Sequence, residues 1–138
     1  PEDAQIAFAN HLVTIRTEGP ASKQRNLTVA DLIDLFLEWV QEERSEETYA
    51  TRQRYCERFA NFKTGSSKTR LGHFPAKQVC ANDLKQWRGS LNREKFDAQT
   101  ILHAETSVRA CFNWGLKHGY LPPNFRPFAT VERTRVPL

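Results

Sequence analysis

The chain has 138 residues and a net charge of +4 at pH 7, and 39% of its residues are hydrophobic. A chain of this length buries about two thirds of the surface that its unfolded form exposes, so it needs no metal or disulfide to fold. No apolar run approaches the roughly 20 residues of a membrane span, and the first residues lack the features of a signal peptide. We therefore expect a cytoplasmic protein without a membrane partner. The start at Pro1 and the absence of methionine favour a piece of a longer polypeptide.

Charge is strongly segregated along the chain. Residues 1–47 carry four basic and ten acidic side chains, whereas residues 48–95 carry eleven basic and three acidic ones. The net charge is therefore −6 in the first segment and +8 in the second. A basic segment of this kind creates a positive field, and nucleic acid is its commonest partner. The alternative explanation is an ordinary, well-solvated basic surface.

The three cysteines, Cys56, Cys80 and Cys111, are widely spaced and odd in number. Two of them fall on apolar helix faces, so we predict buried free thiols in a reducing compartment. A zinc site needs paired ligands at short spacing, which this sequence lacks. No metal or other cofactor is therefore expected.

The first 26 residues are predicted to lie outside the compact domain. Apolar residues recur at helical spacing between Pro1 and Arg16, which predicts a short peripheral helix. Residues 17–26 lack this periodicity and contain Gly19-Pro20, which is typical of a linker.

The first core helix is predicted over Val29 to Glu43. Thr28 is a good N-cap, Asp31 lies three residues after it, and a broad apolar face follows.

Ser45 is the expected N-cap of the second core helix, which ends before Gly65. This helix is the most basic of the predicted elements. Its core stripe is predicted to contain Tyr55, Phe59 and Phe62.

Pro75 excludes a helix around its own position, so residues 71–75 are predicted to cross the domain in extended form. Leu71, Phe74 and Val79 are the expected apolar anchors of this stretch. Asn82 is the expected N-cap of a third core helix, with its apolar face at Leu84, Trp87 and Leu91.

The fourth core helix has signals for both of its ends. It is predicted to begin at Asp97 or Ala98, and Gly119 followed by Pro122-Pro123 predicts its end. Its buried stripe is predicted to be Ile101, Ala104, Val108, Cys111, Phe112 and Gly115, and its free face to be His103, Thr106, Ala110, Asn113 and Lys117.

These elements predict an all-α protein, because no alternating strand pattern is long enough to compete. The helical domain spans residues 27–124, and residues 125–138, with few helical signals, are predicted to be an exit linker. The core is predicted to contain Leu32, Phe36, Tyr55, Phe59, Trp87, Val108 and Phe112.

This order of elements resembles the core-binding domain of the tyrosine recombinase, or phage integrase, family over about residues 27–135. Three motifs carry the resemblance. They are the Thr28–Trp39 segment, the tyrosine- and arginine-rich Thr48–Phe62 helix, and the Ser107–Phe125 segment with its basic-glycine helix end. The chain departs from the family pattern after Asn124, which is followed by Phe125 and not directly by proline.

The resemblance implies a SAM-like orthogonal bundle of four to five helices that clamps one face of duplex DNA. A C-terminal catalytic domain of the same polypeptide would clasp the other face, and further recombinase protomers would share the DNA. The second and fourth core helices would approach the major groove. Hydroxyl groups near helix starts and arginine side chains suit phosphates and base edges. The implied DNA-facing residues are Thr48, Thr51, Arg52, Arg54, Arg58, Thr100, His103, Thr106, Ser107 and Arg109.

No catalytic residue is expected in this chain. The family's catalysis uses a tyrosine nucleophile and a His-X-X-Arg signature, which none of the four histidines of this chain satisfies. The chain is therefore predicted to be non-enzymatic, with a DNA-cleaving recombinase as its parent protein. The alternative is a helical protein-interaction domain that associates with itself through its acidic first half and basic centre.

Overall fold

The computed structural model describes residues 27–65 and 68–137. The predicted N-terminal helix and linker, residues 1–26, lie outside the described residues. In the described ranges the chain forms helices and no strand, which confirms the all-α prediction. The elements are α3 (Val29–Glu43), α4 (Glu46–Asn61), the 3₁₀ turns η1 (Leu71–His73) and η2 (Ala76–Gln78), α5 (Ala81–Arg93) and α6 (Ala98–Lys117).

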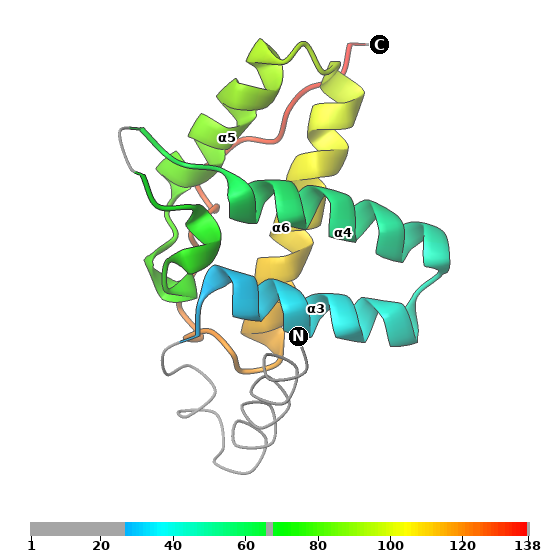
Figure 1. Ribbon diagram of the computed structural model, residues 1–138, viewed down its shortest axis with the longest axis vertical. Coiled ribbons are helices and arrows are strands. Elements are labelled where there is room, and N and C mark those ends of the chain that lie inside the picture. Colours follow the sequence, from blue (N-terminus) through cyan, green and yellow to red (C-terminus); the bar gives the residue numbers. More distant parts are fainter. Residues whose placement is uncertain (1–26, 66–67, 138) are drawn as a thin grey trace.

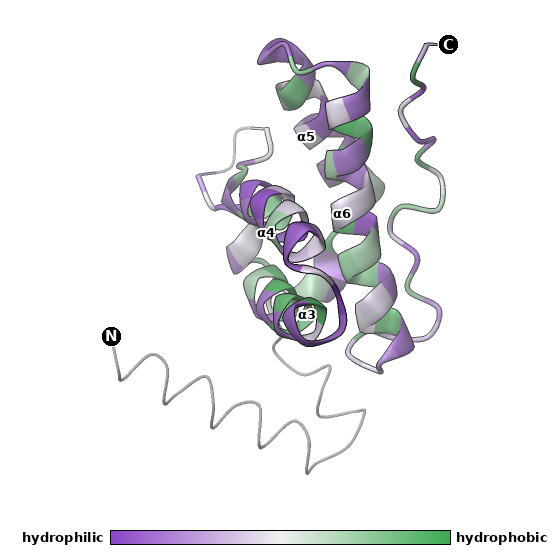
Figure 2. Ribbon diagram, turned by 90° about the vertical axis from the view of Figure 1, so that its right-hand side faces the viewer, coloured by the Kyte–Doolittle hydropathy of each residue, from purple (hydrophilic) through white to green (hydrophobic). Residues whose placement is uncertain are grey.

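Helix α6 is the centre of the bundle. Helices α3 and α4 lie side by side and cross α6 on one side, and α5 packs beside the first half of α6 (Figure 1). The segment after α6 turns back and runs along the side of α6 that faces away from α3 and α4 (Figure 2). One long helix therefore contacts the other three described α-helices, and the 3₁₀ turn η1 packs on α3 and α4.

Three of the predicted helix starts are confirmed, each with a side chain that satisfies a free backbone N–H group. Thr28 Oγ1 accepts from the N–H of Asp31 at 3.1 Å, and the Asp31 carboxylate accepts from the N–H of Thr28 in return. Ser45 Oγ accepts from the N–H of Thr48 at 3.2 Å, and Asp97 Oδ1 accepts from the N–H of Thr100 at 2.8 Å. These bonds are local, which is why the sequence could predict them.

The third helix starts earlier than predicted. Its N-cap is Cys80 and not Asn82, and helix α5 begins at Ala81. The carboxylate of Asp83 accepts from the N–H of Cys80 at 2.9 Å. The cap therefore comes from a residue inside the first turn that reaches back, a role that the amino-acid type at position 80 does not reveal.

The segment around Pro75 differs from the predicted extended crossing. Pro75 itself is extended, with φ −56° and ψ 134°, but a 3₁₀ turn lies on each side of it. Backbone bonds join this segment to the start of α3: Val29 donates to Phe74 at 2.9 Å, and Ala76 donates to Leu27 at 2.8 Å. The turns allow the chain to fold back against α3 while Pro75 stays out of a helix.

The core forms around aromatic rings from three helices. Phe59 is completely buried and meets Trp87 and Phe112 edge-on, with ring centroids 5.3 and 6.4 Å apart. Six of the seven predicted core residues are buried, namely Leu32, Phe36, Phe59, Trp87, Val108 and Phe112. Tyr55 is only half-buried, because Cys56 and not Tyr55 points into the contact between α4 and α6.

The thiols of Cys56 and Cys111 are free and buried, as predicted, whereas the thiol of Cys80 is free and exposed. Burial raises the pKa of Cys111 well above its usual value, and the neighbouring Cys56 raises it further. The Cys111 side chain therefore behaves as a neutral, apolar group of the core.

Two glycines shape the second half of α6. A Cβ atom at Gly115 would lie 2.7 Å from the Cδ1 atom of Leu32, so a larger residue there would force this side chain of α3 to shift. Gly119 has a φ of +81°, and the N–H of Tyr120 donates to the carbonyl of Gly115 at 2.8 Å. The predicted helix stop at Gly119 is therefore confirmed.

Residues 125–137 form no helix, but they pack against the bundle. Phe128 and Val131 are buried, and the Phe128 ring meets Phe112 edge-on with centroids 5.2 Å apart. The segment that the sequence suggested as an exit linker thus covers part of the core. Within the described ranges, no helix combines the length and apolarity needed to cross a bilayer.

Candidate nucleic-acid interface

The predicted interface is built where α4 crosses α6. The Arg52 guanidinium donates to Ser107 Oγ at 3.1 Å, and that hydroxyl donates to the carbonyl of His103 at 3.1 Å. The Cys56 thiol lies 3.6 Å from the carbonyl of Ser107. These contacts fasten the middle of α4 to α6.

The ten candidate residues differ widely in exposure. Arg54, Arg58 and His103 are exposed. Five more are half-buried: Thr48, Thr51, Arg52, Thr100 and Thr106. Among these eight accessible residues, Arg52 forms a side-chain hydrogen bond between α4 and α6, with Ser107 as its partner.

Ser107 is completely buried, contrary to the expectation that it faces DNA. Its hydroxyl is used entirely inside the protein, as acceptor for Arg52 and donor to His103. The physical reason is that α4 covers this turn of α6. Ser107 thus positions Arg52 and offers no surface to a ligand.

Arg109 also differs from the expectation, because it points toward the C-terminal segment. Its guanidinium donates to the carbonyls of Phe128 at 3.2 Å and Val131 at 2.8 Å. Burial lowers the pKa of Arg109, and the charge of Arg133 lowers it further. This arginine therefore holds the C-terminal segment on α6 and does not face the same side as Arg54.

Arg58 extends from α4 to the residues that precede α6. It forms an ion pair with Glu94 at 2.7 Å, and its guanidinium lies 5.0 Å from the ring centre of Phe96. The side chain still exposes 42% of its surface, so the ion pair is easily exchanged for another anion.

His103 lies on the exposed face of α6, one turn before Ser107. Its Nε2 atom is 2.9 Å from the side-chain amide nitrogen of Gln99, which orients the ring. Of the predicted residues, Arg52, His103 and Ser107 are therefore linked at the crossing of α4 and α6.

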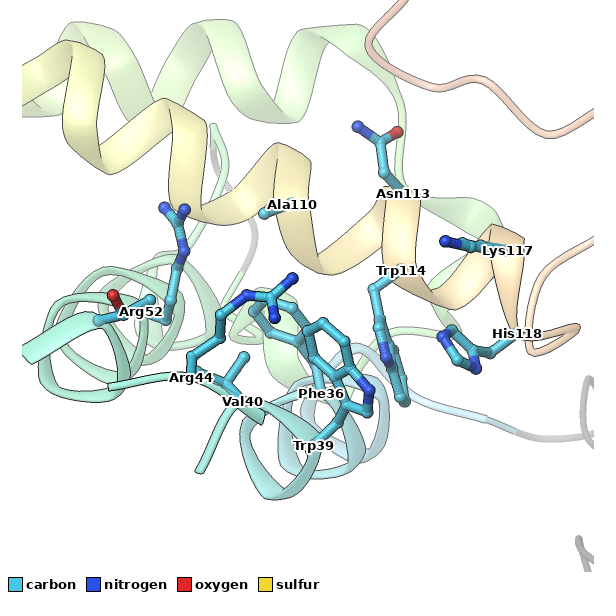
Figure 3. A pocket seen from close by; sticks show the side chains of 11 residues that line it. Phe36, Trp39, Val40, Arg44, Arg52, Ala110, Asn113, Trp114, Lys117 and His118 are labelled. Carbon is cyan, nitrogen blue, oxygen red and sulfur yellow. The ribbon is translucent and has the colours of Figure 1, made fainter. Parts of the chain in front are cut away.

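A groove of about 300 Å³ adjoins this crossing on the side of the α3 C-terminus. Figure 3 shows Trp39 and Trp114 beside each other between α3 and α6, with Arg44 and Arg52 on one side and Lys117 and His118 on the other. No described residue that lines the groove is acidic. The groove thus has an aromatic floor and a cationic rim.

The rings of the aromatic floor lie against one another, some stacked and some tilted. The Trp114 ring lies between those of His118 and Tyr120, with centroids 4.9 and 5.2 Å away. The Trp39 ring lies 6.2 Å from Trp114, and the Arg44 guanidinium lies 4.9 Å from the Trp39 ring centre. The aromatic rings of the groove already contact other groups of the protein. The cations on its rim are therefore the groups with which the groove could bind a ligand.

The interpretation of the sequence missed this groove. A signal was present, because Trp39 and Trp114 lie near the ends of two apolar stripes and each is followed within five residues by a cation. The sequence could not show that the two tryptophans meet, since α3 and α6 are separated by more than 50 residues.

Among the described residues, no group of three His, Cys, Asp or Glu side chains is arranged to hold a metal ion.

Comparison of the chain with protein-family models, with curated proteins and with solved structures finds no match.

Proposed function

We propose that this chain is a DNA-binding module of a site-specific tyrosine recombinase, corresponding to the core-binding domain that clamps duplex DNA during integration or recombination. In this proposal α4 and α6 bind one face of the duplex. A separate catalytic domain of the parent protein supplies strand cleavage and rejoining, and this chain supplies affinity and register.

The observation that carries the proposal is the Arg52–Ser107 bond at the crossing of α4 and α6. It fastens α4 to α6 while Arg54 and Arg58 of one helix and His103 of the other remain exposed. Two helices that cross in this way present side chains to both a groove and its flanking phosphates.

Each group has a role that follows from its chemistry. Arg54 and Arg58 can bind phosphate oxygens or the edge of a guanine through two N–H groups. Thr48 offers a hydroxyl in the first turn of α4, and Thr100 lies in the first turn of α6, where the helix dipole favours an anion. The net charge of +8 over residues 48–95 supplies the attraction at longer range.

Titration of a labelled duplex of mixed sequence, followed by fluorescence anisotropy at several salt concentrations, tests the proposal. If four to six phosphates are neutralised, the logarithm of affinity should fall with the logarithm of salt concentration at a slope of about −4 to −5. Absence of DNA binding at low salt, or an affinity that does not change with salt concentration, contradicts the proposal.

Arg54→Ala is the sharpest variant, because Arg54 is exposed and its removal should leave the melting temperature unchanged. We expect weaker DNA binding and a slope that is shallower by about 1. Arg135→Ala is the matched control, since it removes the same charge from the exposed C-terminal segment. Equal effects of both variants would mean that only net charge matters.

A second candidate function is a protein-interaction domain that associates with itself. The observation that favours it is an exposed acidic tip between α3 and α4, formed by Glu42, Glu43, Glu46 and Glu47, in a molecule that also has the cationic groove. Size-exclusion chromatography with light scattering separates the candidates. Self-association without affinity for DNA favours the interaction domain.

A further inference from the structure

Several cations of the basic central segment have no part in the surface at the α4–α6 crossing. Lys63, Lys85 and Arg93 instead converge on a cleft of about 470 Å³ between the end of α4 and helix α5. Figure 1 shows how the chain after α4 passes beside α5 at this place. The remaining lining residues are Phe62, Gly65, Gln86 and Gly89.

The cleft follows from the spacing of residues on α5. Lys85, Gly89 and Arg93 are four residues apart, so they lie along one face of the helix. Gly89 has no side chain, which leaves an opening between the two cations. The N–H of Gly65 donates to the side chain of Gln86 at 2.7 Å, which holds the chain after α4 against α5.

The charge of this cleft has one sign. Its described lining holds three cations and no carboxylate. The nearest acidic residue in sequence, Glu94, is paired with Arg58 at 2.7 Å. Three cations without a counter-charge around an open cleft favour the binding of a polyanion.

We propose that this cleft binds the sugar–phosphate backbone of duplex DNA, as a second contact beside the α4–α6 crossing. The inference rests on the proposed function and extends it to residues of α5. Arg58 and Phe62 line the hollow next to the cleft, so the cleft continues the exposed arginine side of α4. The Phe62 ring offers an apolar wall to a deoxyribose, and the lysines act as point charges for phosphates.

Filling the cleft without changing its charge gives the first test. A Cβ atom at Gly89 would meet only the Arg93 guanidinium, at an ordinary 3.5 Å, so Gly89→Ala fits the native structure. Gly89→Leu adds a larger side chain that occupies the opening, and both variants favour the helix over glycine. We expect Gly89→Leu to weaken DNA binding at least threefold and Gly89→Ala to bind like the wild type. Thermal melts of both variants should match or exceed the wild type.

Removal of charge gives the second test. The double variant Lys63→Gln with Lys85→Gln should make the salt slope shallower by about 2, because two phosphate contacts are lost. The control is Lys77→Gln with Lys95→Gln, which removes the same charge from exposed lysines outside both the cleft and the groove. We expect the control pair to leave the slope within experimental error of the wild type.

The outcomes separate this inference from the proposed function. Failure of the wild-type chain to bind DNA overturns both. Wild-type binding with a steep salt slope, combined with equal slopes for the two double variants, overturns the cleft alone. Binding of poly-glutamate with the affinity measured for DNA also overturns it, because the cleft would then attract any polyanion.

Discussion

Phe59 shows how much of the stability of this domain depends on single core residues. Its ring is fully buried between Trp87 and Phe112, so it joins α4 to α5 and α6. We predict that Phe59→Ala lowers the free energy of unfolding by about 3–5 kcal/mol, through lost burial and the cavity that remains. Urea denaturation followed by circular dichroism measures this change. Arg54→Ala is the control on the same helix, and a larger loss from it than from Phe59→Ala would show that the facing of α4 is wrong.

Asp34 is a residue whose charge opposes folding. Desolvation by its surroundings raises the pKa of its carboxyl, and the charges of Asp31 and Glu57 raise it further. The folded state therefore binds this proton more tightly than the unfolded state. The ionised carboxylate costs stability at neutral pH, and that cost disappears as the pH falls below the ordinary aspartate value.

The prediction is that Asp34→Asn raises the melting temperature at pH 7 and that the gain vanishes near pH 3. Its size is at most about 1 kcal/mol, because Asp34 is exposed and solvent screens its neighbours. Calorimetry of both proteins across this pH range gives the answer. A gain that grows on acidification would mean that the pKa is lowered and not raised.

At the scale of elements, a buried carboxylate holds the C-terminal segment on the bundle. Glu105 of α6 is completely buried, pairs with the Arg88 guanidinium of α5 and accepts from the Thr134 backbone N–H at 3.1 Å and from its hydroxyl. Arg88 also donates to the carbonyl of Glu132 at 2.6 Å. One carboxylate thus connects α6, α5 and the segment that follows Pro127.

We predict that Glu105→Gln costs about 3–5 kcal/mol, because Arg88 loses its buried counter-charge. Hydrogen exchange should rise first in residues 125–137, where Thr134 loses its charged acceptor. Glu132→Gln is the matched control, since it makes the same change on an exposed side chain of that segment. Unchanged exchange in the segment after Glu105→Gln would show that other contacts hold it.

For the whole molecule, the question is where the folded domain ends. The sequence places the boundary at residue 124, whereas Phe128 and Val131 are buried against the bundle. We predict that a chain ending at residue 124 is less stable than the full chain by about 3–6 kcal/mol, since two apolar side chains are lost from the core. Denaturant melts of both chains measure the difference. A chain ending at residue 136 should have the same free energy of unfolding as the full chain. Equal stability of all three chains would show that the folded domain ends at residue 124.

The limits of the elements follow from local chemistry. Thr28, Ser45 and Asp97 each bond to a backbone N–H group three residues later, so their effect is visible in a short stretch of sequence. The stop at Gly119 is local for the same reason. The start of helix α5 was predicted wrongly, because its cap is formed by the Asp83 carboxylate, which accepts from the backbone N–H of Cys80.

The sequence by itself determined that the chain is helical, where three of the four described α-helices begin, and six of the seven residues predicted for the core. Only the tertiary structure decided which polar residues reach the surface. Ser107 and Arg109 lie two positions apart on α6, yet one is covered by a helix 55 residues away and the other binds a segment about 20 residues later. The type of a polar residue determines which hydrogen bonds it can form. The packing of distant elements decides whether its partner is a protein group or solvent.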